Sequence, residues 1–166
     1  MFMRIFHLLC RYLGNMIPPC QLKSFFFRLS GIKIGNKVHL SHGVYIADGY
    51  YSGLVELEDG VVLSPYTVLI PSSHPNTSFI ADKWKVSKIG KICIKKGAWI
   101  GAGVIVLPGV TIGEGSIIGS NSVVTKDVPD YMVCIGIPAK PIKDVRNFPK
   151  VKKPYKDELL KYISKL

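Results

Sequence analysis

The side chain best suited to acid–base chemistry in this sequence is the imidazole of His74. It precedes Pro75 and stands where a run of six-residue repeats gives way to residues 75–91, which do not follow the repeat. An imidazole, with a reference pKa of about 6.5, can accept a proton from an attacking hydroxyl at neutral pH. Long insertions in a compact domain are usually functional, which directs attention to His74, although a lone histidine at the edge of a loop is more often structural or solvated. The other three histidines lack this setting and are interpreted as surface residues: His7, His39 and His42.

Covalent catalysis is the less favoured alternative. The sequence contains no GxSxG motif, and no cysteine has an evident partner for a catalytic dyad. The four cysteines form no CxxC pair and have no spacing typical of metal ligands, so neither disulfides nor a structural zinc are expected. We interpret them as reduced, buried apolar side chains in a cytosolic protein: Cys10, Cys20, Cys93 and Cys134.

A six-residue repeat over residues 94–129 indicates the structural element that must position His74. Neither a helix, with period 3.6, nor an alternating strand, with period 2, produces such a pattern. An aliphatic residue opens each unit: Ile94, Ile100, Val106, Ile112, Ile118 and Val124. The fifth place is always small or β-branched: Ala98, Val104, Val110, Ser116, Ser122 and Val128.

One such unit cannot bury its aliphatic residue alone, so successive units must stack into a solenoid. Glycine or asparagine at the fourth place suits a corner with positive φ, as at Gly97 and Asn121. Earlier units cover residues 34–51 and 57–74, with a slip in phase near 49–53 that indicates a bulged corner or small loop. The pattern predicts an all-β solenoid, a parallel β-helix, interrupted by a loop at about 75–91.

The segment WIGAGVIVLPGVTIGEGSIIGSNSVVTKDVPDYMVCIGIPAK, residues 99–140, resembles the hexapeptide-repeat acyltransferases. It is closest in form to the sugar O-acetyltransferases among them, such as the maltose and galactoside acetyltransferases and those of polysaccharide biosynthesis. The resemblance implies a left-handed parallel β-helix of triangular section, three hexads per turn, in a homotrimer. It also implies that the loop at 75–91 closes over the active site, often that of a neighbouring subunit.

The same resemblance implies acetyl-CoA as co-substrate, no metal, and a catalytic His-Pro at His74-Pro75. The positions that match acetyl-CoA contacts in the family are Gly101, Ala102, Ser120, Thr125, Lys126 and Lys140. A backbone N–H of Gly101 or Ala102 would stabilise the oxyanion. For Gly101, Ala102 and Ser120 the alternative is a purely structural role as small residues of corners and faces. Lysine at 140, where the family often has arginine, puts a bidentate phosphate contact in doubt.

Trp84, in the loop, and Trp99 could line a pocket for a sugar acceptor, because aromatic faces suit sugar rings. Carboxylates that could bind sugar hydroxyls include Glu56 and Glu58, but no spacing singles one out.

The formal net charge of the chain is +11, and this charge is unevenly distributed along the sequence. Residues 1–37 carry six Lys or Arg and no acid, residues 38–139 carry seven against eight, and residues 140–166 carry nine against three. A nucleic-acid-binding protein would concentrate its charge on the folded body, so nucleic acid is not an expected partner. We divide the chain into three parts: a helical segment at residues 1–31, the β-helix domain at residues 32–139, and a basic tail at residues 140–166. A helix is expected within the tail at residues 155–166.

Residues 1–16 and 21–30 have the pattern of amphipathic helices. The apolar stripe of the first contains Ile5, Leu9 and Tyr12, and that of the second contains Leu22 and Phe25. Arginines interrupt the first, which is also too short to span a bilayer. Two interpretations remain: the helices cap the solenoid, or residues 1–30 contact anionic lipid at the inner face of the cell membrane.

The leading functional hypothesis is an acetyl-CoA-dependent sugar O-acetyltransferase of surface polysaccharide or lipopolysaccharide biosynthesis, working in the cytoplasm by direct attack in a ternary complex. Its acceptor is a carbohydrate, and the basic ends favour one that is lipid-linked or polymeric. An N-acetyltransferase of a nucleotide-linked amino sugar, or an antibiotic acetyltransferase, would share these motifs. A γ-type carbonic anhydrase and a non-catalytic scaffold are alternatives of other classes; the histidine spacing disfavours the first.

Overall fold

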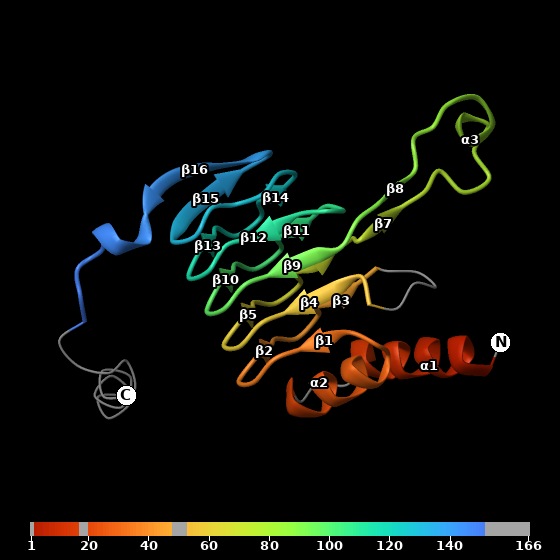
Figure 1. The fold of residues 1–166 in the computed structure, drawn as a ribbon, viewed down its shortest axis with the longest axis horizontal. Coiled ribbons are helices and arrows are strands. Elements are labelled where there is room, and N and C mark those ends of the chain that lie inside the picture. Colours follow the sequence, from red (N-terminus) through yellow and green to blue (C-terminus); the bar gives the residue numbers. More distant parts are fainter. Residues whose placement is uncertain (1, 17–19, 48–52, 152–166) are drawn as a thin grey trace.

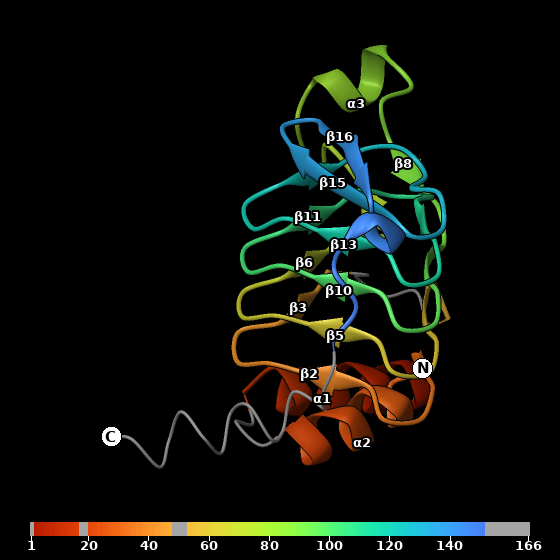
Figure 2. The same cartoon turned by 90° about the vertical axis from the view of Figure 1, so that its left-hand side faces the viewer.

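The computed structural model describes residues 2–16, 20–47 and 53–151 as a three-sided stack of short strands with two helices at one end (Figures 1 and 2). The helices are α1 (Phe2–Met16) and α2 (Cys20–Leu29). Sheet A contains β1 (Lys33–Ile34), β4 (Val55–Leu57), β9 (Ile92–Ile94) and β12 (Thr111–Ile112). Sheet B contains β2 (His39–Leu40), β5 (Val62–Leu63), β10 (Trp99–Ile100), β13 (Ile117–Ile118), β15 (Met132–Gly136) and β16 (Ala139–Asp144). Sheet C contains β3 (Tyr45–Ile46), β6 (Val68–Leu69), β11 (Ile105–Val106) and β14 (Val123–Val124).

Strand pairing shows that the chain visits the sheets in the fixed order A, B, C. Ile94 pairs with Ile112, Ile100 with Ile118 and Val106 with Val124, all in parallel. Each partner therefore lies three hexads, or eighteen residues, along the chain. One turn of the coil is three strands, so the predicted parallel β-helix is confirmed.

The core is the column of side chains that the period predicted. The six aliphatic residues that open the hexads are all fully or almost fully buried, and so are the six at the fifth place. The corners have the predicted backbone: the glycines at 97, 103, 109 and 115 have positive φ, and so does Asn121, at 58°. Asparagine tolerates this left-handed conformation better than other residues with a Cβ, which explains its use there.

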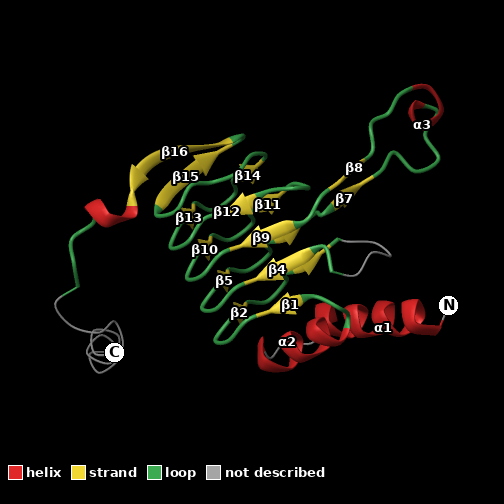
Figure 3. Cartoon of the chain, in the orientation of Figure 1, coloured by secondary structure: helices red, strands yellow, loops and turns green. Residues whose placement is uncertain are grey.

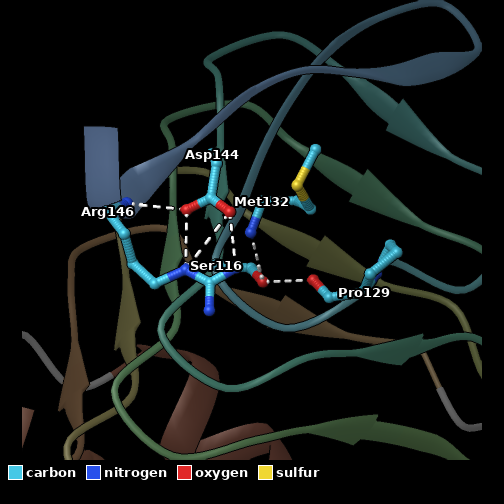
Figure 4. Close-up of polar contacts among 5 residues, drawn as sticks. All are labelled: Ser116, Pro129, Met132, Asp144 and Arg146. Carbon is cyan, nitrogen blue, oxygen red and sulfur yellow. Dashed lines mark hydrogen bonds and ion pairs between the residues drawn. The ribbon is translucent and has the colours of Figure 1, made fainter. Parts of the chain in front are cut away.

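Buried serines within the column bond to the backbone. The hydroxyl of Ser116 donates to the carbonyl of Pro129 at 2.7 Å and accepts the N–H of Met132 at 3.3 Å (Figure 4). These bonds join the last full turn to β15, so the polar side chain is satisfied although it is fully buried.

After the last turn the chain reverses instead of continuing as a tail. β15 pairs in parallel with β13, and β16 then returns antiparallel to β15 after a cis Ile137–Pro138 bond. A short 3₁₀ turn follows, Val145–Asn147, at which Arg146 and Asp144 form an ion pair (Figure 4). Residues 140–147 are therefore structured, which the assignment of 140–166 to a tail did not anticipate. The predicted helix at 155–166 and the centre of the predicted bulge, 48–52, lie outside the described residues.

The two helices cover the first turn of the coil, α2 against β1 and β2 and α1 against α2. The buried face of α2 is Lys23, Ser24 and Phe27, whereas Leu22 and Phe25 are exposed. The cap is present, but it does not pack through the apolar stripes that the sequence suggested. Lys23 can be buried because its ammonium donates to the carbonyl of Ser41 at 3.2 Å while its stem packs.

The cysteines follow the prediction in part. Cys10 and Cys134 are buried, as expected. Cys93 is only half-buried, because it is the middle residue of β9 and alternation turns it outward between two buried isoleucines. The side chain of Cys20 lies outside the described residues.

The insertion is an arm that projects from the body (Figures 1 and 3). Its base is an antiparallel pair, β7 (Ser72–Ser73) with β8 (Lys88–Ile89), and its tip holds the short helix α3 (Ile80–Lys83). Coiling resumes at Ile92, as predicted, but the chain leaves the coil at Ser72, slightly earlier than expected.

Candidate active site

His74 lies at the base of the arm, directly after β7, and its side chain is exposed. The pairing of Ser73 with Lys88, and the bond from the N–H of Gly90 to the carbonyl of Pro71 at 2.9 Å, hold this base together. The arm leaves the coil after β6, at the corner where sheet C turns into sheet A. We call this the C–A corner; it includes Pro71 and, two turns further along, Thr125 and Lys126.

Three of the predicted acetyl-CoA contacts meet at the C–A corner. Thr125, Lys126 and Lys140 line one pocket of about 230 Å³, together with Cys134 and Pro138. The two lysines come from different elements, the corner after β14 and the strand β16. The lining thus contains two lysines and a threonine, which suit phosphate groups, and also Asp127, whose carboxylate accepts the N–H of Thr111 at 2.7 Å. Burial raises the pKa of the Cys134 thiol, which keeps it neutral and disfavours it as a nucleophile.

The other predicted contacts occupy the opposite edge of sheet C, at the corner where sheet B turns into it. Gly101 and Ala102 form this B–C corner after β10, and Ser120 stacks on them one turn further along. A Cβ at Gly101 would lie 2.6 Å from the carbonyl oxygen of Ile118 and 2.7 Å from the nitrogen of Ser120, so the close stacking itself requires glycine. Gly101 thus has a structural role whatever else it does.

The two candidate oxyanion donors differ in availability. The N–H of Gly101 donates to the carbonyl of Ile118 at 2.8 Å, as part of the ladder between turns. Among the described residues, the N–H of Ala102 has no backbone or side-chain acceptor, while its carbonyl accepts from Asn121 at 2.8 Å. Ala102 is therefore the donor that a substrate oxygen could use.

The structure does not group the two tryptophans. Trp99 points outward from sheet B and donates its indole N–H to the hydroxyl of Ser64 at 3.1 Å. Trp84 ends the helix at the tip of the arm, where the ammonium of Lys83 lies 5.9 Å from its ring. Both are more than half exposed in this chain.

A larger pocket, which the sequence did not indicate, lies on sheet A near the capped end. Its volume is about 600 Å³, and its lining includes Arg28, Lys33, Glu56, Glu58 and Lys96. Its carboxylates already have partners: Glu56 pairs with Lys91, whose hydrogen bond lowers the pKa of the carboxyl, and Glu58 accepts the N–H of Lys96 at 2.9 Å. Lys33 of β1 and Glu56 of β4 face each other on the outer side of sheet A. This pair of opposite charges is the signal that could have located the pocket.

Within the part of the chain that the structure describes, no three His, Cys, Asp or Glu side chains are grouped so that they could hold a metal ion.

Comparison with known proteins shows which sequences share this coiled stack of hexads. Residues 94–126 match the family described as bacterial transferase hexapeptide (six repeats). The chain is 33% identical over 118 residues to the galactoside O-acetyltransferase of Escherichia coli, covering 71% of this chain and 56% of that protein. It is 45% identical over 94 residues to a Schizosaccharomyces pombe protein with a provisional acetyltransferase name, covering 57% of this chain and 45% of that protein. It therefore spans about half the length of the relatives it matches.

Among solved structures, a galactoside acetyltransferase in complex with coenzyme A aligns with 93% of this chain and 87% of its own. The TM-score is 0.69 and the sequence identity is 25%.

Proposed function

We propose that the protein is an acetyl-CoA-dependent O-acetyltransferase that acts on a sugar hydroxyl. The observation that carries this proposal is the pocket of Thr125, Lys126 and Lys140 at the C–A corner, the corner from which the arm with His74 leaves. Phosphate groups of the donor would bind near the lysines, and the thioester would lie along sheet C toward His74. The similarity to galactoside O-acetyltransferase supports the reaction, and the coenzyme A complex of a related fold supports the donor. In keeping with the family resemblance, we infer that the coil is left-handed.

The chemistry follows from the groups available. The acceptor hydroxyl oxygen attacks the thioester carbonyl carbon while the imidazole of His74 takes its proton. The N–H of Ala102 stabilises the oxyanion of the tetrahedral intermediate. The carbon–sulfur bond then breaks, the acetyl ester leaves with the sugar, and the coenzyme A thiolate recovers the proton from the imidazolium. Holding both substrates in one complex supplies much of the remaining rate.

We propose a homotrimer in which each site is shared between two subunits. His74 and Ala102 lie at opposite edges of sheet C in one chain, and the C–A corner of one subunit facing the B–C corner of the next would bring them together. The outward side chains of sheet C between these corners include Val68, Ile105 and Val123, which suit an interface. Exposed Trp84 on the arm could then reach a neighbouring subunit.

The acceptor is proposed to be a polymeric or carrier-linked sugar of surface polysaccharide or lipopolysaccharide biosynthesis, modified in the cytoplasm. The nearly neutral body with basic ends supports this, because anionic carriers or polymers would be attracted to the ends while the groove remains open to uncharged sugar.

Release of coenzyme A from acetyl-CoA in the presence of a panel of sugars and amino sugars tests the activity. His74→Ala should lower kcat by about 10² to 10⁴, whereas His39→Ala, which removes an exposed histidine from sheet B, should not. Equal activity in both variants would overturn the assignment of the base. Mild alkali distinguishes the products, because an O-acetyl ester is released and an N-acetyl amide is stable; a stable product would favour the N-acetyltransferase alternative.

Complementation tests the shared site. His74→Ala and Ala102→Trp chains, each inactive alone, are expected to recover partial activity when co-expressed, because mixed trimers contain some intact pairs. No recovery in mixed trimers would mean that each site lies within one chain.

A further inference from the structure

The capped end of the solenoid presents an apolar surface that is exposed among the residues that the structure describes. On α1 and α2 six large side chains are between 45% and 64% exposed. They follow helical spacing on each helix, so they form one stripe on α1 and one on α2. We call them the helical face: Ile5, Leu9, Tyr12, Met16, Leu22 and Phe25.

The helical face remains after the helices have completed their own packing. Cys10 and Phe27 are buried, and a Cβ at Gly14 would lie 2.8 Å from the ring of Phe27, so α1 and α2 are already in close contact. Lys23 faces the first coil and bonds to Ser41 there. Capping of the coil therefore does not require the exposed apolar side chains of the helical face, because the helices pack on the coil and on each other through other residues.

Charge indicates what covers this surface. Residues 1–37, which contain both helices, carry six Lys or Arg and no acidic residue, although Lys23 is buried against the first coil and does not contribute to an external surface. A second copy docking here would bring two equally basic segments together, which is unfavourable. An anionic bilayer offers an apolar interior to the apolar side chains and negatively charged headgroups to the cations. Aromatic side chains such as Tyr12 and Phe25 also suit the interfacial region of a membrane.

We propose that the helical face binds the surface of a bilayer rich in anionic lipid and holds the solenoid on it end-on. Neither helix described by the structure is long and apolar enough to cross a membrane, so the contact proposed is one of insertion into the headgroup region. The arm and the sides of the coil lie away from this end (Figure 1), so bound lipid would leave the C–A and B–C corners open.

The proposed trimer would strengthen this contact. A threefold rotation places the three helical faces at the same height along the axis, and simultaneous binding raises the overall affinity by mass action. This step alone rests on the proposed oligomer; the binding of one face does not.

Sedimentation of the full-length protein with vesicles tests the proposal. Vesicles of phosphatidylcholine with 30% phosphatidylglycerol are expected to bind the protein at least about tenfold more tightly than phosphatidylcholine alone, since the basic segment adds roughly 1 kcal/mol per cation near an anionic surface. Binding should fall several-fold between 0.05 and about 0.5 M salt because of screening. The double variant Leu9→Gln with Phe25→Gln should bind at least about tenfold more weakly, from the loss of two apolar side chains.

The matched control is Ile137→Gln with Ile142→Gln, which removes two exposed aliphatic side chains from the hairpin of β15 and β16 at the opposite end and should bind as the unaltered protein does. Circular dichroism and light scattering establish that both double variants keep their fold and mass. The proposal is overturned if the Leu9 and Phe25 double variant binds vesicles as tightly as the unaltered protein. It is also overturned if this variant, and not the control variant, loses its oligomeric state. His74→Ala should still bind vesicles, so failure of the catalytic proposal would leave this result unchanged.

Discussion

Ile100 and Trp99 are adjacent in β10, and their substitutions should have effects opposite to those expected from side-chain size. Ile100 is fully buried, in register between Leu63 and Ile118 of the neighbouring turns. Ile100→Ala removes three carbons, worth about 2.5 kcal/mol of transfer free energy. Because the ladders hold the turns about 4.8 Å apart, the cavity can collapse little, and a cavity term of about 1 to 2 kcal/mol is added. We expect the free energy of unfolding to fall by about 4 kcal/mol.

Trp99→Ala removes a much larger side chain, but one that is 52% exposed and points outward. Its loss costs part of a contact surface and the bond to Ser64, so we expect about 1 kcal/mol. Urea unfolding followed by circular dichroism, at one protein concentration, measures both values. If Trp99→Ala were as destabilising as Ile100→Ala, the inward and outward register of β10 would be wrong.

Four further substitutions test other parts of the structure. Gly101→Ala should cost about 2 kcal/mol, because its Cβ meets backbone of the next turn; an unchanged melting temperature would contradict this stacking. Phe27→Ala should cost about 3 to 5 kcal/mol and Phe25→Ala less than about 1 kcal/mol, since only the first is buried, and equal losses in urea unfolding would refute the assigned face of α2. The Arg146 guanidinium lowers the pKa of Asp144 to about 2. The unfolded carboxyl, at about 3.9, binds protons first on acidification, so this stabilisation is complete above about pH 4 and is lost toward pH 2. Asp144→Asn should therefore flatten the plot of melting temperature against pH in that range, and an unaltered plot would argue against the pair.

The sixfold period was sufficient to predict the core and the corners. An aliphatic residue such as Ile112 recurs at a spacing that only stacked turns can bury, and Asn121 replaces glycine where a left-handed corner allows it. Both signals are local and repeated, so they do not depend on distant segments. The interruption at 75–91 was visible for the same reason, although pairing of Ser73 with Lys88 was not.

The amphipathic pattern located the helices but not the residues through which they pack, because amphipathicity does not identify a partner. Phe25 and Phe27 are chemically alike, but only Phe27 faces the first turn of the coil, where Lys23 also finds a carbonyl acceptor. The return strand β16 was missed because Lys140 and Lys143 read as a solvated tail. These residues form a strand because they pair with β15, and no local sequence pattern indicates that pairing.

The residues of the candidate site, including His74, were named from the sequence by resemblance. Their arrangement in space was decided only by the tertiary structure. Winding of the coil brings Thr125 and Lys126 to the corner from which the arm departs, and reversal at β16 adds Lys140 to the same pocket. Winding also places Ala102 at the opposite edge of sheet C and occupies the N–H of Gly101 in the ladder. A period in sequence determines which side chains are buried, because burial repeats with each turn; which exposed residues meet depends on how many turns separate them and where the chain leaves the coil.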